Sequence, residues 1–342
     1  MNVGIIGFGK MGLLHTGILN SIENVKIVGI VEKEKIIASY VKNLMPDMNV
    51  YNDYKKMFEA EELDLVYITT PISLHFPIML HCIKDKVNFF VEKPLTGNLE
   101  ESEKLCGLLK TSRIIHGVGY NRRFVSTFSK AKYMLDMGIL GVISYVKSSM
   151  YVSNILSKPT GWRSKKSLSG GGVLMDLGAH VIDLLVWYHS YISRVSGKVQ
   201  SIYSNEVEDS VQVNMEFTNG IKGELDTSWS KKGYRLPELN IEITGSKGKL
   251  RVNEDFIKLD LRKSDSSLDV NTTIYKQSLS DGVVIDLVGP EYTKEDVYMV
   301  DCVLNKTQTF VNAFEASKTQ SIIQAIYASA MEGQEMKVKY FS

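Results

Sequence analysis

Short apolar runs alternate with longer amphipathic stretches over the first 120 residues of the chain. The apolar runs, which are typical of buried strands, predict strands at residues 3–6, 25–31, 65–69, 89–91 and 114–118. The amphipathic stretches predict helices at residues 12–20, 34–44, 75–83 and 99–109. Strands and helices that alternate in this way favour a parallel, doubly wound sheet with helices on both faces. We therefore predict one α/β domain over residues 1–121.

The hydrophobic pattern changes after residue 121 and predicts a second domain of a different class. A helix at 125–137 precedes an alternating run at 142–151, and another helix is predicted at about 173–188. Alternating runs flank Thr218-Asn219-Gly220, a turn signal typical of hairpins. Residues 264–296 are interpreted as loops and edge strands. The prediction is an α+β domain over residues 122–342, with a large, mostly antiparallel open sheet and a closing helix at about 319–332 that can pack back on the first domain.

Composition narrows the class of partner. The chain has 342 residues, which fits about two domains, and its net charge is +1. We see no long basic run, which argues against nucleic acid or an anionic membrane as the main partner. Apolar segments such as residues 181–187 are too short to span a bilayer, and we expect no signal peptide before the first strand. The chain has three widely spaced cysteines, Cys82, Cys106 and Cys302. Their odd number and wide spacing argue against a disulfide framework and favour a reducing cytoplasm.

A glycine motif lies between the first predicted strand and the first predicted helix. It consists of Gly7, Phe8, Gly9, Lys10, Met11 and Gly12. The first glycine of a GxGxxG motif permits a tight turn, the second lets backbone approach a pyrophosphate, and the third lets helix and strand pack closely. The N-terminus of the helix then faces the phosphates. A glycine-rich turn without a ligand is the alternative, but the strand before the motif and the helix after it favour a dinucleotide site.

Glu32 directly follows the second predicted strand, about 20 residues after Gly12, where an acidic residue contacts the ribose of a dinucleotide. Its carboxylate would accept hydrogen bonds from the ribose hydroxyls and repel a 2′-phosphate, which favours NAD over NADP. Lys33 and Lys35 weaken this interpretation because either side chain can reach a phosphate. The alternative is that Glu32 is a solvated turn charge.

The third predicted strand ends at Thr69, and Thr70, Pro71 and His75 follow it. Ligands of open α/β sheets lie outside the carboxyl ends of the strands, so these residues are placed to line the cofactor site. His75 is equally suited to cap or pack against its own helix. His15, one turn into the first helix, is interpreted as a packing residue.

Glu92, Lys93 and Pro94 follow a strand that is apolar on both faces. The end of that strand should open into the same cofactor site. A lysine held there in reduced solvent can exchange protons near neutral pH, while Glu92 can set the geometry of the pair or contact the cofactor. A surface Glu-Lys pair after an edge strand is the alternative, and the apolar run before the pair argues against it.

Asp176 and His180 are four residues apart in the helix predicted at about 173–188, which puts them on one face. Glycines at 170–172 precede this helix and allow close approach of a ligand or another backbone. We favour a substrate role, with His180 as a hydrogen-bond partner or proton relay and Asp176 orienting a hydroxyl. A solvated stripe and a metal pair are the alternatives; we see no third ligand with convincing spacing, so no metal is predicted.

These motifs together resemble the Gfo/Idh/MocA oxidoreductases, the family of glucose–fructose oxidoreductase and inositol dehydrogenase. The matching stretches, in family order, are residues 7–12, Thr70-Pro71 with His75, Glu92-Lys93-Pro94, Tyr120-Asn121-Arg122-Arg123, Trp162-Arg163, and Gly170-Gly171-Gly172 through Asp176, Gly178 and His180. The segment at 326–330 is also similar to the family's terminal helix, so the resemblance covers nearly all of the chain. The Glu-Lys-Pro motif is fairly specific, and it is a strong signal in combination with the Gly-Gly-Gly…Asp…His segment.

The resemblance implies a Rossmann domain and a C-terminal domain whose open sheet commonly supports dimers or tetramers. It implies hydride transfer between a ring carbon of a sugar or cyclitol and nicotinamide, with Lys93 as the main acid/base and with Asp176 and His180 binding the reacting hydroxyl. The residues implied to line the nicotinamide and the substrate are Tyr120, Asn121, Arg122, Trp162 and Arg163. We therefore expect NAD as cofactor, a small sugar or polyol as substrate, and a homodimer or homotetramer.

Other interpretations remain open. Arg122 and Arg123 also suit inter-domain salt bridges, and Trp162 suits a loop anchor. Some relatives in the family use tightly held NAD transiently to cleave glycosidic bonds. A nucleotide-sugar dehydrogenase would need extra cations, for which Lys165 and Lys166 are candidates, and an NAD-binding sensor would need no proton relay.

Overall fold

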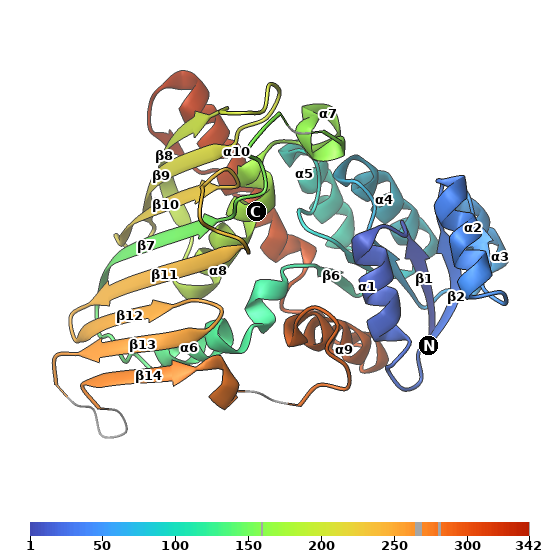
Figure 1. Cartoon of the computed structure of the whole chain (residues 1–342), viewed down its shortest axis with the longest axis horizontal. Coiled ribbons are helices and arrows are strands. Elements are labelled where there is room, and N and C mark those ends of the chain that lie inside the picture. The colour runs from blue at the N-terminus through green and yellow to red at the C-terminus, as the bar shows by residue number, and fades with distance from the viewer. Residues whose placement is uncertain (159, 264–268, 280–281, 342) are drawn as a thin grey trace. The chain divides into compact units, whose positions relative to one another are not determined.

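The computed structural model describes residues 1–158, 160–263, 269–279 and 282–341 (Figure 1). Part of the region predicted as loops and edge strands, residues 264–296, lies outside these ranges. The chain forms two compact units. One contains Met1–Asn121 and Gly282–Ser317, and the other contains Arg122–Asp281 and Lys318–Ser342.

The first unit contains a parallel sheet whose described strands run in the order β3-β2-β1-β4-β5-β6. The strands are β1 (Asn2–Ile6), β2 (Lys26–Val31), β3 (Asn49–Tyr51), β4 (Leu65–Ile68), β5 (Asn88–Val91) and β6 (His116–Val118). All neighbouring pairs are parallel, which confirms the predicted doubly wound sheet. The chain order reverses between β1 and β4, the switch point at which such sheets bind their ligands.

Helices connect these strands. They are α1 (Lys10–Leu19), α2 (Lys35–Leu44), α3 (Tyr54–Ala60), the short η1 (Ile72–Leu74), α4 (His75–Asp85) and α5 (Leu99–Leu109). Asn98 caps α5, since its side chain accepts a 3.0 Å hydrogen bond from the amide of Glu101. The pattern did not predict β3 and α3, because elements this short carry too little periodicity to stand out.

One helix of the first unit comes from far along the chain. The sequence pattern predicts loops and edge strands over residues 264–296 and one domain over 122–342, but α9 (Pro290–Leu304) belongs with residues 1–121. The polar start of α9 hides its helical pattern, while Met299, Val300 and Cys302 pack in the same core as β1 and β5. α9 contacts α1 and lies beside it in Figure 1. Residues 282–317 therefore complete the first unit.

The second unit contains a mixed sheet whose described strands run in the order β14-β13-β12-β11-β7-β10-β9-β8-β15. The strands are β7 (Ile143–Tyr151), β8 (Ile192–Gln200), β9 (Ser210–Phe217), β10 (Lys222–Ser228), β11 (Glu238–Gly245), β12 (Gly248–Val252), β13 (Phe256–Leu261), β14 (Asn271–Tyr275) and β15 (Met336–Lys337). β7 and β10 are parallel, and the other neighbouring pairs are antiparallel. The predicted mostly antiparallel sheet is confirmed.

A helix layer covers one face of this second sheet. Its elements are α6 (Ser126–Asp136), the π-helical η4 (Leu174–Gly178) and α8 (Ala179–Tyr188), which contact the sheet, together with the later part of α10 (Ala313–Glu332). Shorter elements are η2 (Asn121–Phe124), η3 (Trp162–Ser164), α7 (Lys166–Ser169) and η5 (Lys276–Leu279). Along β7, Val146 and Met150 are buried while Lys147 is exposed, so one face of the sheet is apolar and the other polar.

The helical run Lys166–Tyr188 is long and apolar enough to cross a membrane by length and composition. In the folded chain, 83% of its most apolar window is buried. This burial is typical of a core helix, and α8 contacts η4, α6 and β7 within the second unit.

Candidate active site

The glycine motif forms the turn between β1 and α1. Gly7 has a φ of 92°, which favours glycine, and a Cβ there would meet the carbonyl oxygen of Thr69 at 2.9 Å. A Cβ at Gly12 would meet the carbonyl oxygen of Gly7 at 2.0 Å, whereas no atom lies within 4 Å of the place a Cβ would take at Gly9. Gly7 and Gly12 therefore serve the turn, and Gly9 leaves open space at the start of α1, where a pyrophosphate would bind.

Glu32 connects the glycine turn to the start of α2. Its Oε2 accepts a 2.9 Å hydrogen bond from the amide of Phe8, and its Oε1 accepts a 2.8 Å hydrogen bond from the amide of Glu34. The Phe8 side chain packs in the core, whereas Lys10 is exposed and Met11 half-buried. A carboxylate keeps further lone pairs after two such bonds, so Glu32 can still accept from ribose hydroxyls.

The loop after β4 contains two threonines with different surroundings. Thr69 donates a 2.6 Å hydrogen bond from Oγ1 to the carbonyl oxygen of Gly7, so it supports the glycine turn. Thr70 has a buried Oγ1 with no hydrogen-bond partner among the described residues, and Pro71 beside it is half-buried. A buried hydroxyl without a partner is costly, and a bound ligand would satisfy it.

His75 links the loop after β4 to the loop after β5. Its ring nitrogens lie 3.0 Å from the carbonyl oxygens of Thr70 and Pro94, and the residue is 1% exposed. Burial lowers the pKa of His75, and the two carbonyl contacts oppose this shift. His75 thus holds the loop after β4 and the loop after β5 at a fixed spacing.

Lys93 is the second residue after β5 and is half-buried, and the Lys93–Pro94 peptide bond is cis. The Lys93 amide donates a 3.1 Å hydrogen bond to Oε2 of Glu92. β5 lies between β4 and β6, and Phe89 and Phe90 are buried. The alternative of a surface pair after an edge strand therefore does not apply.

A buried charged cluster that the sequence did not predict includes Glu92, the residue that precedes Lys93. His15 Nδ1 is 2.8 Å from Asp296 Oδ1, and His15 Nε2 is 3.3 Å from Glu92 Oε1. Burial by itself would lower the pKa of His15, but Asp296 and Glu92 outweigh burial and raise it to about 10. Burial raises the pKa of Asp296, against the charge of His15. The only sequence signal for this cluster was a histidine on an apolar helix. Its partner Asp296 could not be identified, because it lies 281 residues further along the chain.

The second unit holds Asp176 and His180, which are predicted to bind the substrate hydroxyl. The helix predicted at about 173–188 is π-helical at Asp176 and becomes α-helical before His180, and π-helical turns are frequent at functional sites. Asp176 Oδ2 lies 3.9 Å from Arg163 Nε. The Arg163 guanidinium lies 4.6 Å from the ring centroid of Trp162. The structure thus brings Trp162, Arg163 and Asp176 together, with His180 one turn further on.

Glu208 is a further residue at this helix that sequence reasoning missed. Its carboxylate accepts hydrogen bonds of 3.0 Å from the amide of Gly172, 2.9 Å from the amide of Leu174 and 2.8 Å from the hydroxyl of Tyr327. Burial raises the pKa of Glu208, and these hydrogen bonds oppose the shift. A Cβ at Gly171 would meet the Tyr327 hydroxyl at 2.1 Å, and one at Gly172 would meet the Glu208 carbonyl oxygen at 2.1 Å. These glycines therefore allow close approach of protein groups, one of the two uses the sequence suggested.

The two arginines after Asn121 each pair with a carboxylate of the second unit. Arg122 Nη1 lies 3.3 Å from Glu254 Oε1. Arg123 forms a buried, two-point hydrogen bond with Asp183.

The two residues before these arginines are buried in the first unit. Tyr120 is 1% exposed and Asn121 is 4% exposed. Oδ1 of Asn121 has no hydrogen-bond partner within the described chain. Like the Thr70 hydroxyl, it is a buried polar atom that a ligand would satisfy.

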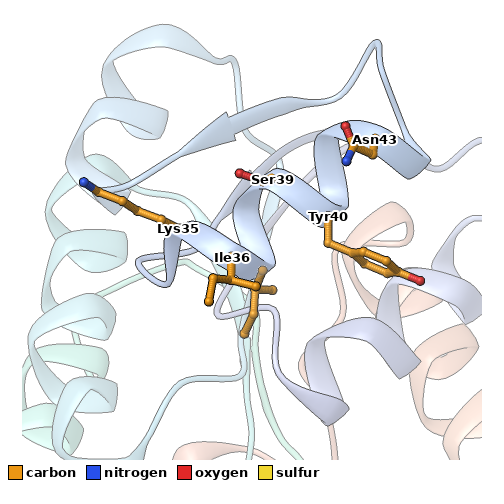
Figure 2. Close-up of a pocket in the computed structure, with 6 residues that line it drawn as sticks. Lys35, Ile36, Ser39, Tyr40 and Asn43 are labelled. Atoms are coloured by element: carbon orange, nitrogen blue, oxygen red, sulfur yellow. The ribbon is translucent and has the colours of Figure 1, made fainter.

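A hollow of 540 Å³ lies on the outer surface of α2 and contains none of the predicted site residues. It is lined by Lys35, Ile36, Ile37, Ser39, Tyr40 and Asn43. Figure 2 shows Ile36 and Tyr40 on the same side of the helix. Every lining residue belongs to one helix, so this hollow lacks the converging polar groups of a binding site.

The residues present in the first unit fit a dinucleotide cofactor. The open space at Gly9, the carboxylate of Glu32 and the Oγ1 of Thr70 lie in the loops that follow β1, β2 and β4. These loops leave the carboxyl ends of adjacent parallel strands, where open α/β sheets bind dinucleotides. Among the described residues, no group of three or more His, Cys, Asp or Glu side chains is arranged to hold a metal.

Comparison with known sequences identifies both halves of the chain. Residues 1–120 match an oxidoreductase family with an NAD-binding Rossmann fold, and residues 128–251 match the GFO/IDH/MocA C-terminal domain. A myo-inositol 2-dehydrogenase of Thermotoga maritima is 25% identical over 73% of this chain and 74% of its own length. A levoglucosan dehydrogenase of Pseudarthrobacter phenanthrenivorans is 26% identical over 74% of this chain and 73% of its own length. An NAD(+) scyllo-inositol 2-dehydrogenase of Bacillus subtilis is 27% identical over 72% of each.

Solved structures agree on the fold. A levoglucosan dehydrogenase in complex with NADH superposes with a TM-score of 0.90 at 21% identity and covers 100% of both chains. At 21% identity this similarity shows only that the fold is shared. The two family matches show that the chain is an oxidoreductase. The chain belongs to the Gfo/Idh/MocA family of NAD-binding oxidoreductases.

Proposed function

We propose that this enzyme oxidises a secondary alcohol of a sugar, glycoside or cyclitol with NAD, and that Lys93 is its acid/base. The observation that carries the proposal is the position of Lys93. It is a half-buried lysine at the end of β5, in the same sheet whose β1 and β2 lead into the glycine turn and Glu32. Relatives named as inositol and levoglucosan dehydrogenases support a polyol or sugar as the substrate.

When bound, NAD supplies the acceptor for hydride. In its neutral form, the Lys93 amine takes the proton of the substrate hydroxyl while the hydrogen on the same carbon leaves as hydride, so the alcohol becomes a ketone. In the reverse direction the protonated amine returns the proton to the carbonyl oxygen. General acid–base catalysis of this kind contributes typically about 10²–10⁴-fold to the rate.

We propose that Asp176 and His180 bind the reacting hydroxyl. His180, on the first turn of α8, donates to or accepts from the hydroxyl oxygen, and Asp176 orients a hydroxyl of the ring. The contact of Asp176 with Arg163 supports this role, because it holds the carboxylate while leaving it one-third exposed. Residues proposed to line the substrate and the nicotinamide are Tyr120, Asn121, Arg122, Trp162 and Arg163.

A screen for NAD reduction tests the function. The purified chain is supplied with NAD or NADP and, in separate wells, with cyclitols, free hexoses, anhydrosugars, glycosides and UDP-sugars. We expect NADH from at least one cyclitol or sugar, and faster reduction of NAD than of NADP because of Glu32. Sugar released without NADH would instead establish the glycosidase-type reaction, and activity confined to UDP-sugars the nucleotide-sugar dehydrogenase. If no compound is converted although calorimetry shows NAD binding, the NAD-binding sensor is the remaining interpretation.

We also propose that the polar face of the second unit's sheet joins copies of the chain into a homodimer or homotetramer. This face has a hollow of 560 Å³ lined by residues of β7, β8, β9 and β10. It carries both signs of charge, as in the 2.8 Å pair of Lys147 and Glu224, so it is able to complement a second copy of itself.

Analytical ultracentrifugation tests this association. We expect a particle of two or four 38.4 kDa chains, and a lower mass for a variant with Lys147→Glu and Lys198→Glu. Lys84→Glu, on an exposed position of α4, is the control and should keep the wild-type mass. A wild-type monomer at micromolar concentration would exclude the proposed assembly.

The cytoplasm is the compartment we propose for the enzyme. All three cysteines, Cys82, Cys106 and Cys302, are free and buried. Free thiols suit a reducing compartment, where NAD-dependent metabolism also takes place.

A further inference from the structure

His15 lies between two carboxylates in the core of the first unit. Its Nδ1 is 2.8 Å from Oδ1 and 2.9 Å from Oδ2 of Asp296, and its Nε2 is 3.3 Å from Oε1 of Glu92. The side chains of His15 and Asp296 are both fully buried. The ring of His15 packs against the rings of Tyr67 and Phe90, with each centroid 5.2 Å away. A neutral imidazole donates from one nitrogen and an imidazolium from both, so two carboxylate neighbours favour the charged ring.

Glu92 continues this line of contacts to Lys93. Its Oε1 faces His15, and its Oε2 accepts the 3.1 Å hydrogen bond from the Lys93 amide. A Cβ at Gly119 would lie 3.1 Å from Oε2, so glycine at that position leaves the carboxylate its space. The Glu92 side chain is 13% exposed. The carboxylate is thus held from one side by the imidazole ring and from the other by the backbone of Lys93.

The same ring belongs to the helix that starts at the glycine motif. His15 lies in α1, one turn after Gly12, and its other partner Asp296 lies in α9. We propose that His15 is a positioning residue: anchored on Asp296, it holds Glu92 and thereby fixes the backbone of Lys93 relative to the helix that begins at the cofactor turn. That Lys93 matters for turnover rests on the proposed function. The contacts of His15 with Asp296 and Glu92 are independent of that proposal. The rival role is purely structural, in which the ring merely anchors α9 through Asp296.

Two substitutions separate the two nitrogens of the ring. The amide nitrogen of asparagine comes near the position of Nδ1, and that of glutamine comes near the position of Nε2. His15→Asn therefore keeps a donor toward Asp296 and loses the one toward Glu92, and His15→Gln does the reverse. Both variants remove the positive charge, so they form a matched pair that differs in which contact survives.

If His15 is a positioning residue, the variant with the higher kcat should have the lower Tm. We expect kcat of His15→Asn to be about 10-fold or more below that of His15→Gln, because small misplacements of a reacting group are costly. We expect the higher Tm for His15→Asn, which keeps the shorter contact with Asp296. If kcat and Tm fall in the same order, the ring is a structural anchor and the proposal is wrong.

A measurement without turnover keeps this test separate from that of the function. The rate at which acetic anhydride labels Lys93, read by peptide mass spectrometry, should change in His15→Asn and stay near wild type in His15→Gln. Lys84, an exposed lysine, is the internal control. A wild type that oxidises no alcohol overturns the proposed function, while the labelling rates still decide the positioning role. If either His15 variant fails to fold, Glu92→Leu replaces the pair, and unchanged labelling of Lys93 in that variant overturns the proposal.

Discussion

Lys93→Met is expected to lower kcat by about 10²–10⁴-fold, the typical contribution of a general acid–base group. Methionine keeps most of the volume of the lysine stem but cannot carry a proton. NAD affinity measured by calorimetry should change little, because the glycine turn and Glu32 lie in other loops and keep their contacts. Steady-state kinetics with the substrate found in the screen provides the measurement.

Lys84→Met is the matched control, since it removes the same charge from an exposed position of α4. It should keep wild-type kcat and wild-type Tm. A Lys93→Met enzyme that turns over at the wild-type rate would refute Lys93 as the acid/base. A variant that loses NAD affinity together with kcat would instead assign Lys93 to cofactor binding.

Asp183→Leu is expected to lower the free energy of unfolding by about 3–5 kcal/mol, because it removes the carboxylate that pairs with a buried guanidinium. Arg123 Nε donates to Asp183 Oδ2 at 2.8 Å, and Nη2 donates to Oδ1 at 2.6 Å. The two side chains are 2% and 1% exposed. The Arg123 guanidinium also lies 5.5 Å from the ring centroid of Trp187, so urea unfolding can be followed by tryptophan fluorescence.

The double variant Arg123→Met with Asp183→Leu should regain part of this loss, since replacing both charges by apolar groups leaves no unpaired ion. Lys132→Met provides the exposed comparison. It breaks an i,i+4 pair with Asp136, and such pairs contribute about 0.3–0.5 kcal/mol. If Asp183→Leu costs no more than Lys132→Met, the buried pair does not stabilise the second unit as argued.

The parallel sheet and the cofactor motifs could be predicted because their signals are local. The order of strand, Gly7 to Gly12 and helix lies within the first twenty residues, and the apolar run before Lys93 is short and continuous. In the second unit, alternation along strands such as β7 predicted one buried and one polar face. These patterns depend on which neighbours in sequence are apolar, so one sequence is enough to read them.

The supporting residues of the site could not be predicted for the opposite reason. His15 meets Asp296 across 281 residues, and Glu208 meets the amide of Gly172 across 36. Neither carboxylate stands in a motif, and their roles arise from packing that no local pattern reports. The polar start of α9 likewise gave no sign that Met299 and Val300 belong to the core of the first unit.

The division of the chain into its two units has a consequence for synthesis on the ribosome. When residues 1–281 have been made, the first unit still lacks α9, and the second unit still lacks β15 and the later part of α10. Neither core is complete at that point, although every strand described for the first sheet has already been synthesised. The first unit therefore cannot complete its core before most of the second unit has been made. A premature stop codon between residues 282 and 317 truncates both units, and an expression fragment that ends at residue 121 lacks part of its own core.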